Sequence, residues 1–331
     1  MNPTSLNPNL ALGVDTFVQQ ATQFTQIQND TIEAANAYLT QIQSQQSFAD
    51  DIERNDFDIP IHDDYIVPIR ITRRIDQDGD LPFVFYIHGG GWILGNPMIY
   101  DHLLRQLTKG SYASVVFVDY TKAPTAKYPN QLKELWDILN HLLRHKELYR
   151  LNQSKIVLSG DGIGANMAAV LTNYAHTQGL HIDYQLLLYP SLDANLNLSS
   201  YQQFENGPWI SKNTMQWFWD NYLPDINVKN QEMVSPLLIP DDELKGLPDT
   251  LIITAENDIT RDDGETYARK LTNAGVNAAC VRFNGTIHDF LMLEPLAHTL
   301  PTKSAFKLIT SSLREVFWGS DCFYNTTECD I

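Results

Sequence analysis

The chain contains 331 residues, of which 43% are hydrophobic and 19% are charged, a composition typical of globular proteins and not of disordered ones. Its 40 Asp and Glu residues outnumber 23 Lys and Arg residues, which gives a net charge of −17. A field of that sign repels phosphate backbones and anionic lipid surfaces, so nucleic-acid binding is not expected. No apolar run approaches the ~20 residues that span a bilayer, and the first basic side chain is Arg54. We therefore expect a cytoplasmic protein without a membrane span.

The three cysteines and nine histidines show no spacing typical of a zinc site, and no metal or other cofactor is expected. Cys280 stands in an apolar run and is interpreted as a small core residue. Cys322 and Cys329 flank a short polar segment, and the sequence leaves open whether they form a disulfide. It also leaves open whether the chain forms a homodimer.

Two stretches within residues 1–50 carry apolar side chains at helical spacing, which predicts one or two amphipathic helices. Beyond about residue 56, short β-branched and aromatic runs alternate with helical patterns. The predicted strands cover residues 65–71, 83–87, 115–118, 156–158, 184–189, 251–254 and 279–283. The predicted helices cover residues 98–109, 130–146, 163–177, 263–274 and 303–316. The last five strands are nearly continuous apolar runs, typical of strands covered on both faces, so we expect a largely parallel sheet with crossover helices.

Residues 194–235 interrupt this alternation with a cluster of aromatic side chains. The cluster comprises Phe204, Trp209, Trp217, Phe218, Trp219 and Tyr222. Such an insertion could line a ligand cage above the carboxyl ends of the strands. Aromatic stripes more often pack against one another, so the packed core of a cap is the favoured interpretation.

The strand at 83–87 leads directly into His88-Gly89-Gly90-Gly91. Three consecutive glycines leave backbone N–H groups free to approach a ligand oxygen closely, as an oxyanion hole requires. A flexible turn or a phosphate cradle would also contain glycines. The position of this motif directly after a strand favours the oxyanion loop of a hydrolase.

A second glycine-rich segment joins a predicted strand to a predicted helix and reads Gly160-Asp161-Gly162-Ile163-Gly164. A nucleophile elbow has the form G-x-S-x-G, and here Gly162 stands where the Ser is expected. With Ala165 the segment also fits the dinucleotide-binding form G-x-G-x-x-A, but that fingerprint usually opens the first βαβ unit and would leave the other motifs unexplained. Ser159 is expected at the strand end, pointing away from the site, and so is not a substitute nucleophile.

Asp258 follows the strand at 251–254, and His288 lies in the loop after the strand at 279–283. Alone, each residue has an ordinary explanation, as a carboxylate at a strand end or a histidine in a loop. The chain order of elbow, Asp and His is the order of the hydrolase triad, so together with the glycine loop they favour a catalytic site.

With these motifs in this order, the chain resembles the hormone-sensitive-lipase-like branch of the α/β-hydrolases, which are microbial carboxylesterases, over about residues 50–318. The resemblance implies an α/β-hydrolase fold with a mostly parallel eight-stranded sheet, helices on both faces and a helical cap. It places the cap in residues 1–50 and 194–235, the core in residues 51–193 and 236–318, and a C-terminal tail in residues 319–331.

The resemblance also implies roles for individual residues. The N–H groups of Gly90, Gly91 and Ile163 would bind the oxyanion, His288 would be the general base and acid, and Asp258 would orient it. Asp161 would be structural, and the two loops would be supported by His88, Gly89, Gly160 and Gly164. Because Gly162 has no side chain, an esterase for short acyl esters would be inactive or strongly impaired with this sequence.

Two alternatives stay open. The chain could be a non-catalytic protein that binds a small apolar acid or ester on a hydrolase scaffold. It could also be a lyase, or a hydrolase that activates a water, that uses the His288–Asp258 dyad without a covalent intermediate. In each case the expected partner is a small-molecule ester or acid.

Overall fold

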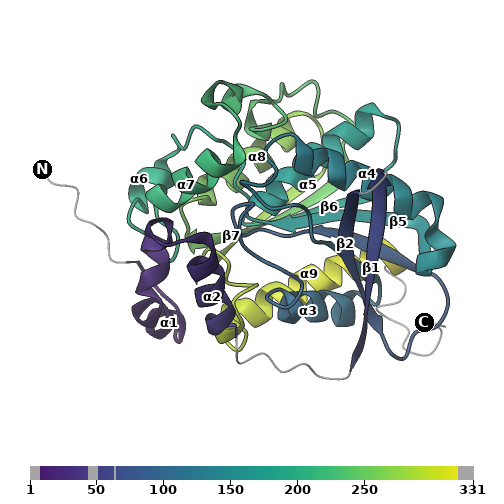
Figure 1. The fold of residues 1–331 in the computed structure, drawn as a ribbon, viewed down its shortest axis with the longest axis horizontal. Coiled ribbons are helices and arrows are strands. Elements are labelled where there is room, and N and C mark those ends of the chain that lie inside the picture. The colour runs from purple at the N-terminus through teal and green to yellow at the C-terminus, as the bar shows by residue number, and fades with distance from the viewer. Residues whose placement is uncertain (1–7, 44–50, 63–64, 320–331) are drawn as a thin grey trace, which may run out of the picture.

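The computed structural model describes residues 8–43, 51–62 and 65–319 (Figure 1). Eight strands form one sheet in the order β1-β2-β4-β3-β5-β6-β7-β8. Their bounds are β1 Ile52–His62, β2 Tyr65–Arg74, β3 Leu81–Ile87, β4 Ser114–Val118, β5 Leu151–Asp161, β6 Tyr184–Leu188, β7 Asp249–Asn257 and β8 Ala278–Ile287. Strand β2 is antiparallel to both β1 and β4, and all other neighbours are parallel. The predicted fold class, a mostly parallel eight-stranded sheet, is confirmed.

Helices cover both faces of this sheet (Figure 1). Helices α3 and α9 lie side by side on one face, and α4, α5 and α8 lie on the other. The α-helices are α1 Val14–Gln20, α2 Ile32–Ile42, α3 Asp101–Ser111, α4 Asn130–Arg144, α5 Ile163–Thr177, α6 Ser199–Gln203, α7 Lys212–Tyr222, α8 Arg261–Asn273 and α9 Leu300–Trp318. The 3-10 helices are η1 Thr22–Asn29, η2 Lys146–Tyr149, η3 Ile226–Asn230, η4 Pro236–Leu238 and η5 Glu294–Leu296.

The two edge strands are where the sequence was least informative. Strand β1 was not predicted, because charged side chains such as Glu53 and Asp56 interrupt its apolar alternation. It pairs with β2 alone in the sheet order, so it needs no continuous apolar run.

The expectation that the last predicted strand is covered on both faces is wrong. Strand β8 is the other edge of the sheet, and its side chains from Ala278 to Asn284 are partly buried or exposed. Cys280 is accordingly half-buried rather than a core residue, and burial raises the pKa of its thiol to about 11. Cys322 and Cys329 lie outside the described residues, as do parts of the predicted segments 1–50 and 319–331.

The predicted N-terminal helices form as α1, η1 and α2, with a break at Ala21 between the first two. They pack against the aromatic cluster of residues 194–235 at one end of the sheet (Figure 1). The rings of Phe24 and Trp209 stack with centroids 3.8 Å apart, and Ser211 Oγ donates to the Thr25 carbonyl at 2.8 Å. Every aromatic side chain of that cluster except the half-buried Trp217 is buried, as predicted for a packed core.

Within the described residues, no helix combines the length and apolar character needed to cross a bilayer.

Candidate active site

The loop after β3 presents unpaired backbone donors. Gly90 and Gly91 have φ angles of +80° and +64°, which favour glycine. A Cβ on Gly91 would lie 2.0 Å from Cδ1 of Phe218, so only a glycine lets this ring approach the loop so closely. Within the described chain, neither N–H group donates a hydrogen bond, while the Gly90 carbonyl accepts from Leu94 N at 2.8 Å. The two N–H groups are therefore available to an oxygen atom of a ligand.

The base of this loop is held by His88 and Gly89. The His88 ring stacks on Phe117 and Tyr120, with centroid distances of 4.9 and 4.3 Å. Its Nδ1 lies 2.9 Å from the Gly89 carbonyl, and Tyr120 Oη donates to the His88 carbonyl at 3.0 Å. Complete burial lowers the pKa of His88 well below its ordinary value, so the ring is neutral and supports the loop.

Gly162 joins β5 to α5 in a sharp turn. Its φ and ψ angles of +52° and −116° lie in a region where non-glycine residues cost about 1–3 kcal/mol. Two further glycines allow α5 to approach the strands closely at this turn. A Cβ on Gly164 would lie 2.1 Å from the Ile87 carbonyl oxygen of β3, and a Cβ on Gly160 of β5 would lie 2.5 Å from the Gly164 carbonyl group. Gly162 N donates to the Leu188 carbonyl at 2.9 Å. The segment thus makes a sharp strand-to-helix turn like that of the G-x-S-x-G motif, with Gly162 at the position of the Ser.

The direction of a side chain at position 162 is defined by the backbone. A Cβ on Gly162 would lie 3.2 Å from Nε2 of His288, and apart from its chain neighbours no other described residue lies within 4 Å of it. By contrast, Ser159 is fully buried within β5, and its hydroxyl has no hydrogen-bond partner among the described residues. Position 162 is therefore the one that faces the histidine.

His288 is paired with Asp258, as expected from the sequence order. Nδ1 of His288 lies 2.8 Å from Oδ2 of Asp258, and both side chains are buried. The other oxygen of Asp258 accepts hydrogen bonds from the N–H and the hydroxyl of Thr260, at 2.8 and 3.1 Å. Asp258 is thereby fixed and holds the imidazole with Nε2 toward Gly162.

A second carboxylate flanks the same ring, and the sequence analysis missed it. Oδ1 of Asp289 lies 3.5 Å from Nε2 of His288, and Oδ2 of Asp289 accepts from the indole N–H of Trp209 at 2.9 Å. Burial raises the pKa of Asp289. The only signal in the sequence was the position of this Asp directly after the histidine, and its partner Trp209 lies 80 residues earlier in the chain.

The two carboxylates decide the charge of His288. Burial by itself favours the neutral ring, but the charges of Asp258 and Asp289 outweigh it and raise the pKa of His288 to about 9. The two carboxylates therefore favour the protonated ring over the neutral one. In the protonated state both ring nitrogens donate hydrogen bonds.

Asp161 lies beneath the elbow and joins it to the glycine loop. Its carboxylate accepts from Tyr86 Oη at 2.7 Å, Tyr100 Oη at 3.0 Å and Gly89 N at 2.9 Å. Burial, followed by the charge of Asp289, raises the pKa of Asp161 to about 7. These bonds give Asp161 a structural position.

Five of the predicted site residues line one small cavity, namely Gly90, Gly91, Gly162, Ile163 and His288. It is lined by Phe24, Leu39, Gly90, Gly91, Gly162, Ile163, Ser191, Ile210, Met215, Phe218, His288, Asp289 and Met292. Its volume of about 20 Å³ holds a single water molecule. Among the described residues, no three His, Cys, Asp or Glu side chains are arranged to hold a metal ion.

Comparisons with known proteins agree with this fold. The profile of a family described as the alpha/beta hydrolase fold matches residues 84–292. A mimivirus protein named as an alpha/beta hydrolase, R526 of Acanthamoeba polyphaga mimivirus, is 36% identical over 92% of this chain and 87% of its own length. Carboxylesterase NlhH of Mycobacterium tuberculosis is 31% identical over 88% of this chain and 92% of its own length. The crystal structure of a thermostable esterase from Pseudomonas putida superposes with a TM-score of 0.90 and 33% identity, covering 94% of this chain and 98% of that one.

Proposed function

Because this chain belongs to the hormone-sensitive-lipase-like α/β-hydrolases, we propose that it is an esterase for short acyl esters whose nucleophile position is occupied by Gly162. The observation that carries the proposal is the direction of a side chain at this position, 3.2 Å from its Cβ to Nε2 of His288. A serine hydroxyl placed there would come within hydrogen-bond reach of the histidine, as a nucleophile requires.

The other parts of the proposed machinery each have a physical role. The N–H groups of Gly90, Gly91 and Ile163 would stabilise the oxyanion of the tetrahedral intermediate, with the N-terminus of α5 adding its positive dipole. In an enzyme with Ser at position 162, His288 would take the hydroxyl proton and return it to the leaving alcohol, while Asp258 would stabilise the imidazolium that forms.

Without a hydroxyl at position 162, no acyl-enzyme can form by this route. In a serine protease, loss of the nucleophile lowers turnover about 10⁶-fold and leaves roughly 10³–10⁴ over the uncatalysed reaction. We therefore expect this chain to be inactive or strongly impaired as an esterase.

The cap is part of the same proposal. We place it in residues 1–50 and 194–235, over a core of residues 51–193 and 236–318. Its support is the cavity lining, to which Phe24 and Leu39 contribute from the first segment and Met215 and Phe218 from the second. An apolar, nearly filled cavity favours a short acyl group.

The test compares Gly162→Ser with the parent chain on p-nitrophenyl acetate and butyrate. We expect the Ser variant to gain several orders of magnitude in kcat/KM, since every other group is present. Gly162→Ala is the matched control, because it adds the same Cβ without a nucleophile and should stay at the parent's rate. A Gly162→Ser, His288→Ala double variant should lose the gain.

Three results would oppose the proposal. If neither the parent nor Gly162→Ser hydrolyses these esters, the esterase proposal fails for them and a binding function leads. If the parent already turns over and the Ser variant adds little, a mechanism through His288 and Asp258 alone replaces it. If Gly162→Ala gains as much as Gly162→Ser, the hydroxyl is not the nucleophile.

A further inference from the structure

We propose that the groove between α3 and α9 binds a soluble organic anion that has an apolar body. This groove has a volume of about 410 Å³ and belongs to the face of the sheet that carries these two helices (Figure 1). None of its lining residues contributes to the catalytic cavity. The site is therefore independent of the proposed esterase function.

The walls of the groove are two helix faces. His102 and Lys109 lie seven residues apart on α3, and Lys303 and Lys307 lie four residues apart on α9, so each pair occupies one side of its helix. The helices touch where a Cβ on Gly110 would lie 2.2 Å from Cγ2 of Thr310.

The floor of the groove is apolar. The buried ring of Phe306 meets the His102 ring edge-on, with centroids 6.0 Å apart and an angle of 75° between the planes. Ala297 also lines the groove and is buried. A hydrocarbon or aromatic group bound here would bury apolar surface on Phe306 and Ala297.

The rim is cationic, opposite in sign to the chain as a whole. Lys303 and Lys307 are exposed on it, and no Asp or Glu lines the groove. Lys303 and Lys307 take part in no ion pair within the described chain, whereas Nζ of Lys109 lies 2.6 Å from Oδ2 of Asp51. In a protein with a net charge of −17, two lysines without a carboxylate partner beside an apolar floor are suited to a ligand anion.

The surroundings of His102 in the groove favour its neutral form. Burial lowers the pKa of His102 to about 4, and the positive charge of Arg105 acts in the same direction while the charge of Asp101 opposes it. His102 is therefore neutral and can contribute a hydrogen bond, while the lysines supply the charge. The overall negative charge of the chain opposes an anionic membrane surface, so a soluble ligand is the better match.

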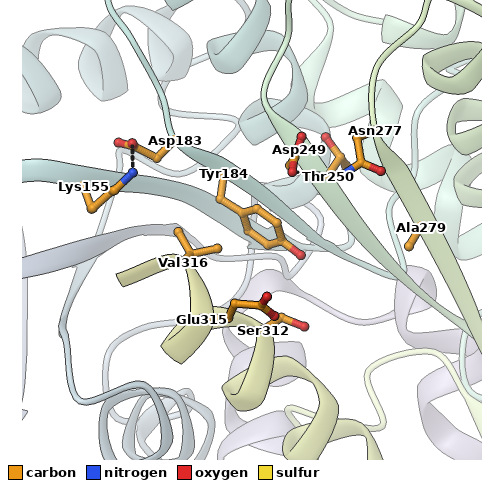
Figure 2. Close-up of a pocket in the computed structure, with 10 residues that line it drawn as sticks. All are labelled: Lys155, Asp183, Tyr184, Asp249, Thr250, Asn277, Ala279, Ser312, Glu315 and Val316. Carbon is orange, nitrogen blue, oxygen red and sulfur yellow. Dashed lines mark hydrogen bonds and ion pairs between the residues drawn. The ribbon is translucent and has the colours of Figure 1, made fainter. Parts of the chain in front are cut away.

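A second cleft of similar size lacks the combination of unpaired lysines and an apolar floor. The cleft at the amino ends of β6, β7 and β8 has a volume of about 470 Å³ (Figure 2). Its one lysine, Lys155, pairs with Asp183 at 3.0 Å, and Asp249 and Glu315 also line it. Its lysine is therefore neutralised, which makes Lys155 a suitable control.

The test uses octyl phosphate as the probe and isothermal titration calorimetry on the full chain. We expect saturable binding of one molecule per chain, weakened about tenfold in Lys303→Gln/Lys307→Gln by the loss of two charge contacts. Lys155→Gln should bind the probe as the parent does. Raising NaCl to about 1 M, where the screening length falls to ~3 Å, should weaken binding. Octanol and inorganic phosphate should each bind at least tenfold more weakly than octyl phosphate, since each lacks one half of the ligand.

Several outcomes would overturn the proposal. Absence of saturable binding would do so, and so would binding that Lys303→Gln/Lys307→Gln leaves unchanged, because the probe would then occupy another site. Inorganic phosphate binding as tightly as octyl phosphate would remove the role of the apolar floor. If Lys155→Gln weakened the binding of octyl phosphate as much as Lys303→Gln/Lys307→Gln does, the change in net charge alone would explain the loss.

Discussion

A side chain at position 162 should cost the protein stability. The φ and ψ angles of +52° and −116° are sparsely populated by residues other than glycine, which predicts a loss of about 1–3 kcal/mol in Gly162→Ala. The new Cβ also meets Nε2 of His288 at 3.2 Å, a tight contact. For a chain of this size, roughly 2 °C accompanies each kcal/mol, so the melting temperature should fall by ~2–6 °C.

The assay is thermal unfolding followed by circular dichroism, with two matched variants. Gly275 has a φ angle of +82° and open space around it, so Gly275→Ala reports the cost of a positive φ angle without a new contact. Adding His288→Ala to Gly162→Ala removes the contact and leaves the backbone strain. The double variant should therefore melt below His288→Ala by most of the difference that separates Gly162→Ala from the parent. A Gly162→Ala chain as stable as the parent would refute the strain argument, and with it the idea that restoring a nucleophile here lowers stability.

Three further predictions concern the same site. The pKa of His288 is about 9 in the folded chain and 6.5 for the free side chain, so its stabilising contribution is present below pH 6.5 and is lost as the pH rises through 9; urea midpoints over that range should fall more steeply for the parent than for His288→Gln. Trp209→Phe removes the donor to buried Asp289 and should lower the free energy of unfolding by about 1–3 kcal/mol, whereas an unchanged urea midpoint would contradict that hydrogen bond. Gly91→Ala drives a Cβ into the Phe218 ring and should destabilise the chain, and Phe218→Leu in the same chain should recover part of the loss in a double-mutant cycle.

The chain order of motifs carried most of the site information. Hydrolase loop, elbow, Asp and His each follow a strand that the sequence predicts, and parallel strands bring their carboxyl ends to one edge of a sheet. From the sequence alone, that argument predicts that Gly90, Gly162, Asp258 and His288 lie close together. It says nothing about residues from outside the strand ends.

Asp289 is such a case. Its carboxylate reaches the free nitrogen of His288 because Trp209 holds it there, and that tryptophan comes from a segment between β6 and β7. The charge state of the histidine follows from both carboxylates and from burial, none of which a residue pattern contains. The nearly filled cavity likewise depends on Phe218 lying against Gly91.

Local pattern therefore determined the elements that are apolar throughout, the parallel order of the core strands and the glycine that stands at the Ser position of the G-x-S-x-G motif. These features depend on residue type and spacing along the chain, which the sequence contains directly. Only the tertiary structure decided that β1 and β8 are the edges, that His288 lies between two carboxylates, and that two lysines gather beside Phe306. Each of these depends on contacts between residues far apart in the chain, and their energies arise from burial and charge proximity that exist only after the chain has folded.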